Sequence, residues 1–147
     1  MFVRKISYLH VMKENKMQSP DKIEPTKAEL EILQVLWKHG PSPVRRVMEE
    51  LNKIRELNYT ATLKLMQLMV DKGLLRRDES RMQHIYYPAG DEMETKGHLL
   101  DKFLDNVYDG SATSLLMQLA GNKRTSSEDL KKMRQLLEQL EKEQQKK

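Results

Sequence analysis

The sequence predicts a mainly α fold in which three helices and a β-hairpin precede a second, separate helical region. Three observations predict it. Apolar residues recur at helical spacing in six segments. The pattern changes to short strand-like runs once, between residues 74 and 88. Signals for helix starts and ends flank most of the helical segments. The 147 residues suffice for one or two small domains.

The first helix is expected over about 26–39. Thr26 and Glu29 form a capping box, because the Thr26 hydroxyl can accept a hydrogen bond from the Glu29 amide while the Glu29 carboxylate reaches back. Leucines at helical spacing follow. Gly40 can take the left-handed position after the helix, and Pro41 bars its continuation.

The second helix is expected over about 43–53. Ser42 is predicted as its N-cap and Pro43 as its first helical residue, where a missing amide proton costs nothing. One face of this segment is apolar over two turns, which predicts packing against a core. The residues of that face are Val44, Val47, Met48 and Leu51.

The third helix is expected to begin after Asn58, a favourable N-cap, and to end at Gly73. Its inner face is predicted to contain Thr62, Leu65, Met66 and Met69. Near its start the opposite face is short-chained and polar. Small residues allow close approach to DNA bases, and hydroxyl, amide and ammonium groups can bind base edges or phosphates.

Two short strands are expected over 74–78 and 83–87, joined by a turn over 79–82. Leu75 and either Ile85 or Tyr86 are predicted to face inward. The arginines of this segment, Arg76, Arg77 and Arg81, are predicted to face solvent, and Pro88 to stop the second strand.

Three helices followed by a hairpin predict a winged helix-turn-helix over 25–90, with the third helix as the reading helix and the hairpin as the wing. This segment contains 11 basic and 8 acidic residues, whereas 91–147 contains 10 and 11. The charge distribution favours double-stranded DNA as the partner of the first part. The candidate DNA-binding residues are Tyr59, Thr60, Ala61, Leu63, Lys64 and Gln67 in the third helix, Arg45 and Arg46 in the second, and Arg81 and Gln83 in the wing.

Two alternatives to DNA binding assign a different role to the outward face of the third helix. In one it is a plain solvated surface; in the other, Leu63 and Leu68 are exposed and contact a partner protein. An enzyme is disfavoured, because the four histidines fall in unrelated segments and no phosphate-binding loop or catalytic motif is present. The absence of cysteine excludes Cys-based metal sites, and no metal or other cofactor is expected.

Residues 91–147 are expected to form three amphipathic helices. The first runs over about 91–109, the second opens at Ser111 or Ser114, and the third follows a capping signature at 126–129. About 50 residues are too few to bury these apolar faces alone, so a second copy of the chain is the expected cover. The predicted dimerisation residues are Phe103, Val107, Tyr108, Leu115, Leu119, Leu130, Met133, Leu136, Leu137 and Leu140.

Residues 1–24 are interpreted as a flexible extension without a function of their own. The apolar stretch after Arg4 and Lys5 is short and no small-residue cleavage site follows, so no export signal is predicted. Met1, Met12 and Met17 are each plausible start residues. No apolar run is long enough for a membrane span, so no direct membrane insertion is expected.

The chain resembles the BlaI/MecI penicillinase-repressor family of bacterial transcription regulators over about residues 25–140. The segments that carry the resemblance, in matching order and spacing, are PTKAELEILQVLWKHGP (25–41), NYTATLKLMQLMVDKGLL (58–75), IYYP (85–88), FLDNVYDGSATSLLMQL (103–119) and TSSEDLKKMRQLLEQL (125–140). The resemblance implies a cytoplasmic homodimeric repressor that binds an inverted-repeat operator. It also implies release when a membrane-bound sensor metalloprotease triggers cleavage in the C-terminal region.

Three features of the sequence depart from the family pattern. Leu68 stands where an Arg is usual, so a phosphate contact is missing or supplied from elsewhere. Gln118 and Leu119 stand where antibiotic-responsive members have the cleaved Asn-Phe bond. The C-terminal Cys cluster of the copper-responsive branch is absent, which excludes copper sensing by that route.

Overall fold

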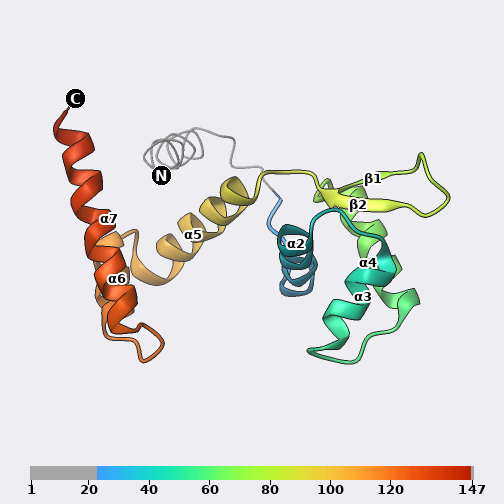
Figure 1. The fold of residues 1–147 in the computed structure, drawn as a ribbon, viewed down its shortest axis with the longest axis horizontal. Coiled ribbons are helices and arrows are strands. Elements are labelled where there is room, and N and C mark those ends of the chain that lie inside the picture. The colour runs from blue at the N-terminus through green and yellow to red at the C-terminus, as the bar shows by residue number, and fades with distance from the viewer. Residues whose placement is uncertain (1–22, 147) are drawn as a thin grey trace. The chain divides into compact units, whose positions relative to one another are not determined.

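The computed structural model describes residues 23–146. Its elements, in chain order, are α2 (Lys27–His39), α3 (Val44–Asn52), α4 (Tyr59–Lys72), β1 (Leu75–Asp78), β2 (Ile85–Pro88), α5 (Glu92–Tyr108), α6 (Ala112–Ala120) and α7 (Ser127–Gln145) (Figure 1). The predicted mainly α fold, with a hairpin between two helical regions, is confirmed. The interpretation of 1–24 as an extension lies outside the described residues, apart from Ile23 and Glu24.

The chain divides into two compact units, with the boundary between Leu99 and Leu100 inside α5. The first unit has one hydrophobic core, to which α2, α3, α4 and both strands contribute. Its buried apolar residues are Ile32, Leu33, Leu36, Val44, Val47, Leu51, Met66, Met69, Leu75 and Tyr86. The predicted inner faces of the three helices therefore form this core, except that Met48 of α3 is only partly buried and lies outside it.

The ends of α2 and α4 follow local sequence signals. The Thr26 hydroxyl accepts from the Glu29 amide at 3.3 Å, and the Glu29 carboxylate accepts from the Thr26 amide at 2.9 Å, which completes the predicted capping box. Asn58 caps α4 by accepting from the Ala61 amide at 2.7 Å. Gly73 ends α4 with a φ of 86°, a left-handed conformation that glycine adopts without steric cost.

The predicted start of α3 is wrong. Pro43 occupies the N-cap position and no side chain caps the helix. The Ser42 hydroxyl instead donates to the Gly40 carbonyl at 2.8 Å. The Ser42 backbone pairs with Tyr86 of β2 through two hydrogen bonds, of 3.0 and 2.9 Å. Ser42 is thus extended and fastens the hairpin to the α2–α3 turn, which leaves its side chain unable to cap α3.

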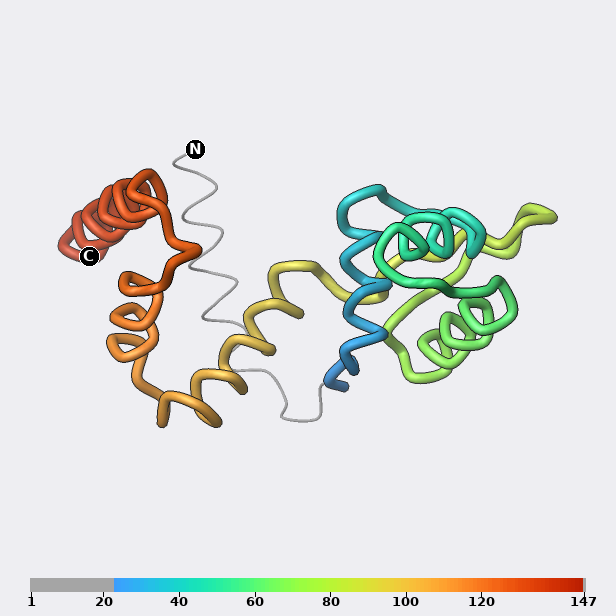
Figure 2. Tube along the Cα trace, turned by 90° about the horizontal axis from the view of Figure 1, so that it is seen from below, coloured from blue at the N-terminus to red at the C-terminus, as the bar shows by residue number. Residues whose placement is uncertain are grey.

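The hairpin is antiparallel, with Leu75 opposite Pro88 and Asp78 opposite Ile85. Of the two candidates for the inward position in β2, Tyr86 is buried while Ile85 is only partly so. β2 begins two residues later than predicted, so Gln83 and His84 belong to the tip. The tip extends beyond the helices of this unit (Figure 2).

The Glu29 carboxylate joins the start of α2 to the end of α4. It is buried and accepts from the Lys72 ammonium at 2.9 Å, in addition to the Thr26 amide. Burial raises the pKa of Glu29, but the hydrogen bonds from Thr26 and Lys72 outweigh it and hold the pKa below its ordinary value of 4.5. The charged form is therefore favoured by folding, and its contribution is lost as the pH falls through the folded-state pKa.

Glu29→Gln is expected to lower the free energy of unfolding by about 1–2 kcal/mol at pH 7, because the amide cannot pair with the Lys72 charge. The difference from the wild type should shrink as the pH falls below 4.5 and through the lower folded-state pKa, where the native carboxylate becomes protonated. Urea unfolding at pH 7 and at pH 3 measures both effects, with the exposed Glu49→Gln on α3 as control. Equal stability of Glu29→Gln and the wild type at pH 7 would contradict this role.

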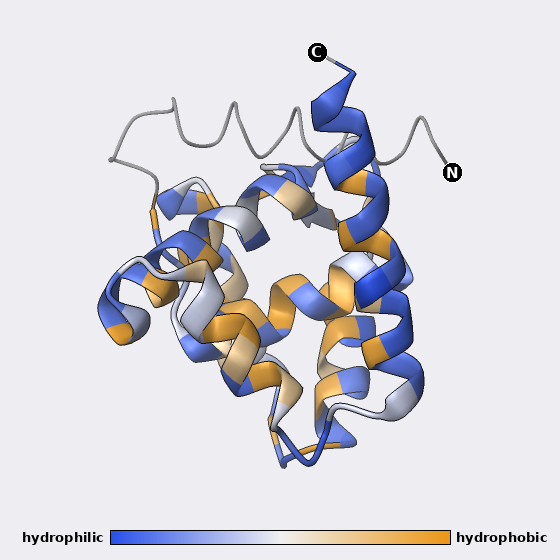
Figure 3. Cartoon of the chain, turned by 90° about the vertical axis from the view of Figure 1, so that its left-hand side faces the viewer, coloured by the Kyte–Doolittle hydropathy of each residue, from blue (hydrophilic) through white to orange (hydrophobic). Residues whose placement is uncertain are grey.

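The helices of the second unit also begin at capping serines. Ser111 caps α6 by accepting from the Ser114 amide at 3.1 Å, which decides between the two predicted starts. Ser126 and Asp129 form the predicted capping box of α7. No residue of α5, α6 or α7 is buried, and α7, the helix that ends near the label C, alternates between hydrophobic and hydrophilic bands (Figure 3). Within 23–146, no helix combines the length and the apolar character that a membrane crossing requires.

Candidate nucleic-acid interface

The outward face of α4 aligns three of the predicted DNA-binding side chains. Thr60, Lys64 and Gln67 follow one another at spacings of four and three residues, so they share one side of the helix. All three are exposed. Because Met66 and Met69 face the core, this line points to solvent. It presents a hydroxyl, an ammonium and an amide along about two turns.

Tyr59 and Leu63 lie on the flank of α4 that faces the hairpin. They line a groove of about 360 Å³ together with Val44, Met82, Gln83, His84 and Tyr86. Tyr59 is half-exposed, whereas Leu63 is only partly exposed and packs against the core. The expectation that Leu63 is exposed is therefore wrong, because its side chain packs partly against the core, whereas its contact with DNA stays a prediction.

Ala61 and Leu68 occupy the other flank of α4. Both are exposed, and Leu68 retains 49 % of its surface. Leu68 lies one turn after Lys64, so the two side chains are neighbours on the surface of the helix. Leu68 thus forms an apolar spot beside the polar line.

Arg81 and Gln83, the two candidate DNA-binding residues of the wing, lie at the hairpin tip. Both are exposed. Hydrogen bonds from the Ser80 hydroxyl and amide lower the pKa of Asp78 and fix the bend that begins the tip. Between the two candidates, Met82 is fully exposed. Sequence reasoning missed Met82 and the groove residue His84, although a large apolar residue inside a predicted turn is a signal that could have drawn attention to the tip.

Arg76 and Arg77 of β1 differ in exposure and in their side-chain contacts. Arg76 is exposed. The Glu79 carboxylate binds the Arg77 guanidinium. Glu79 and, after it, Tyr86 raise the pKa of Arg77. Arg77 therefore belongs to the internal bonding of the hairpin, and its predicted exposure to solvent is only partial.

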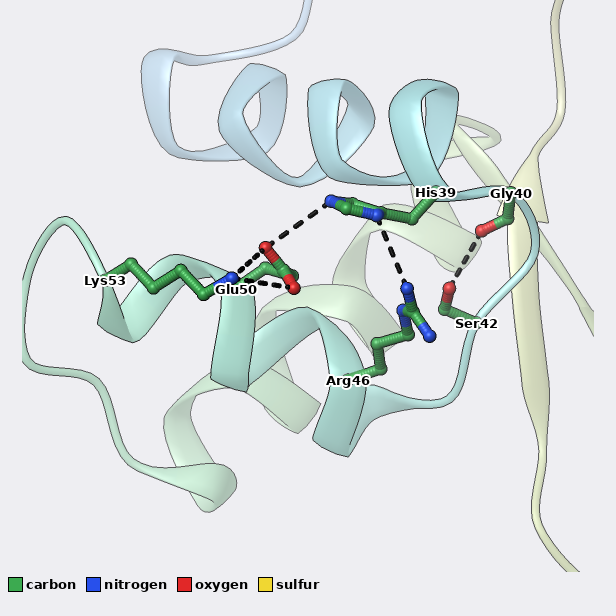
Figure 4. Close-up of polar contacts among 6 residues, drawn as sticks. All are labelled: His39, Gly40, Ser42, Arg46, Glu50 and Lys53. Carbon is green, nitrogen blue, oxygen red and sulfur yellow. Dashed lines mark hydrogen bonds and ion pairs between the residues drawn. The ribbon is translucent and has the colours of Figure 1, made fainter.

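Arg45 and Arg46 lie in the first turn of α3. Both are exposed. Arg46 Nη2 also lies 3.4 Å from Nδ1 of His39, the last residue of α2. His39 also lies 3.4 Å from the Glu50 carboxylate (Figure 4). A hydrogen bond from Lys53 is the largest of the effects that lower the pKa of Glu50.

The described residues contain no group of three or more His, Asp or Glu side chains placed to hold a metal ion. His39, His84 and His98 lie in α2, in the hairpin tip and in α5, respectively. His10 lies outside the described residues.

A core of three helices whose third helix exposes a polar line beside a two-stranded hairpin defines a winged helix-turn-helix protein, a class of DNA-binding regulators. Residues 25–139 match the family model described as penicillinase repressor. The chain belongs to this family.

Individual relatives agree with the family match. The chain is 29 % identical to the penicillinase repressor of Bacillus licheniformis over 115 residues, which cover 76 % of this chain and 88 % of that one. It is 22 % identical to the methicillin resistance regulatory protein MecI of Mammaliicoccus sciuri, with 78 % and 93 % covered. It is 21 % identical to the penicillinase repressor of Staphylococcus aureus, with 82 % and 95 % covered. These names describe regulatory rather than catalytic proteins.

Proposed function

We propose that the protein is a transcriptional repressor that binds an inverted-repeat DNA operator as a homodimer. The observation that carries the proposal is the exposed line of Thr60, Lys64 and Gln67 on α4, in a chain that belongs to a repressor family. In this proposal α4 enters the major groove, Lys64 and Thr60 contact bases or phosphates, and the hairpin tip with Arg81 contacts the adjoining backbone. The bound dimer hinders RNA polymerase.

The proposed dimer is supported by the apolar surface of the second unit. Of the ten predicted dimerisation residues, six are exposed large hydrophobics: Phe103, Val107, Leu119, Leu130, Leu136 and Leu137. Leu116 and Met117 of α6 are also exposed and were not predicted. A two-fold partner of the same sequence would cover such faces. Its symmetry would match the symmetry of a palindromic operator.

We propose cleavage in α6 as the release mechanism. Gln118 and Leu119 are exposed and lie near the C-terminal end of this helix. Proteases prefer exposed, locally open backbone, and the terminal turn of a helix opens more readily than its middle. A cut here separates α7 from the rest of the chain and removes its share of the dimer surface. A membrane-bound sensor metalloprotease is the proposed trigger.

Footprinting on the DNA upstream of the protein's own gene, at two salt concentrations, tests the operator proposal. A protected palindrome that persists at the higher salt concentration is the expected result. Protection that fades uniformly with salt, or is absent, would contradict it. Those results would favour a protein-interaction module that uses Leu68, the exposed leucine of α4.

Lys64→Ala is expected to weaken operator binding about tenfold and, if Lys64 contacts a phosphate, to reduce the slope of log affinity against log salt by about 0.9. Lys131→Ala, which removes the same charge from the exposed surface of α7, serves as control and should leave both quantities unchanged. Titration of labelled operator at several salt concentrations measures them. Equal losses for the two variants would show that only net charge matters.

A further inference from the structure

His39 lies between two side chains of the next helix. At the end of α2, its Nδ1 is 3.4 Å from Arg46 Nη2 and its Nε2 is 3.4 Å from Glu50 Oε2 (Figure 4). Lys53 holds the same carboxylate, with its Nζ at 3.0 and 3.2 Å from the two oxygens. The His39 and Glu50 side chains are 22 % and 21 % exposed, so both are largely enclosed by their neighbours.

The contact with Arg46 determines which nitrogen of the His39 ring carries the proton. A guanidinium only donates, so Nδ1 of His39 must accept from Arg46. Nε2 then bears the proton of the neutral ring and faces the Glu50 carboxylate at 3.4 Å. The carboxylate in turn accepts from Lys53. The imidazole therefore fixes one edge of Arg46 relative to α2, and Glu50 fixes the imidazole.

We propose that His39 is a positioning residue that orients Arg46 for contact with a DNA phosphate. The inference rests on the proposed function. Arg46 lies in the first turn of α3, the helix that precedes the reading helix and crosses the DNA backbone in this architecture. The contact with His39 uses one of the five guanidinium N–H donors, which leaves others for a phosphate.

On α4 the position one turn after Lys64 is Leu68, whose side chain offers a phosphate no hydrogen-bond donor, so Arg46 of α3 is the nearer candidate for such a contact. A free arginine loses much conformational freedom when it binds a phosphate. The contact with His39 already restricts the side-chain conformations of Arg46 before DNA binds. The affinity gained from Arg46 should therefore depend on the side chain at position 39.

A double-mutant cycle on the full-length chain tests the inference, with the footprinted upstream DNA as probe. Arg46→Ala should weaken binding about tenfold and reduce the salt slope by about 0.9. His39→Ala should weaken binding about three- to tenfold in the wild-type background and have no effect in the Arg46→Ala background. His39→Asn, whose side-chain oxygen can lie where Nδ1 lies, should restore most of the binding.

The outcomes separate this inference from the function on which it rests. If the wild type fails to bind the DNA specifically, the proposed function fails. If the wild type binds and Arg46→Ala has no effect, or His39→Ala has the same effect with and without Arg46, the function stands and the positioning role is overturned. Thermal unfolding of each variant identifies losses due to misfolding. Failure of a folded His39→Asn variant to recover binding also overturns the role.

Discussion

Leu136→Asp is expected to convert the protein to monomers and to weaken operator binding about a hundredfold or more. Leu136 lies on α7 and is 40 % exposed, so a carboxylate there can stay hydrated in a single chain. In the proposed dimer the same carboxylate would be desolvated against the apolar face of the partner. Without dimer contacts the second half-site binds as an independent event, and the gain from linking two sites is lost.

Light scattering and titration of palindromic DNA measure the two effects separately. Gln135→Asp is the matched control, because it introduces the same group at an exposed polar neighbour on the same helix. It should leave both the dimer and the affinity unchanged. A stable dimer in Leu136→Asp would remove α7 from the proposed interface.

The sequence predicts helix ends well where the signal and its partner are near each other along the chain. Thr26 with Glu29, and Asn58 with the start of α4, act within three residues, and the structure has both. Ser42 fails as a predicted cap because its conformation depends on β2, a strand much further along the chain. A distant backbone partner outweighs a local side-chain preference, and no local pattern reveals it.

The same distinction holds for the candidate site. The exposed line of Thr60, Lys64 and Gln67 follows from helical periodicity once the inner face of α4 is known. The partial burial of Leu63 does not, because it depends on how the side chain packs against a core built from other elements. The contact between Arg46 and His39 likewise requires α2 and α3 to cross at one particular angle, which spacing within either helix cannot determine.

Tyr86→Ala is expected to lower the free energy of unfolding by about 3–5 kcal/mol, because removing a fully buried aromatic ring leaves a cavity in the core. Tyr86 is 1 % exposed and is one of two hairpin residues in the core, together with Leu75. Its backbone pairs with Ser42, so the ring also holds the hairpin against the α2–α3 turn. Loss of the ring should loosen the hairpin as well as the core.

Urea unfolding combined with amide hydrogen exchange checks both consequences. Exchange of the Ser42 amide, which donates to the Tyr86 carbonyl at 3.0 Å, reports directly on the attachment of the hairpin. Tyr86→Phe is the control: it keeps the ring, loses only the hydroxyl, and should cost about 1 kcal/mol. If Tyr86→Ala protects the Ser42 amide as well as Tyr86→Phe does, the backbone pairing alone holds the hairpin. In that case the ring contributes only to the core.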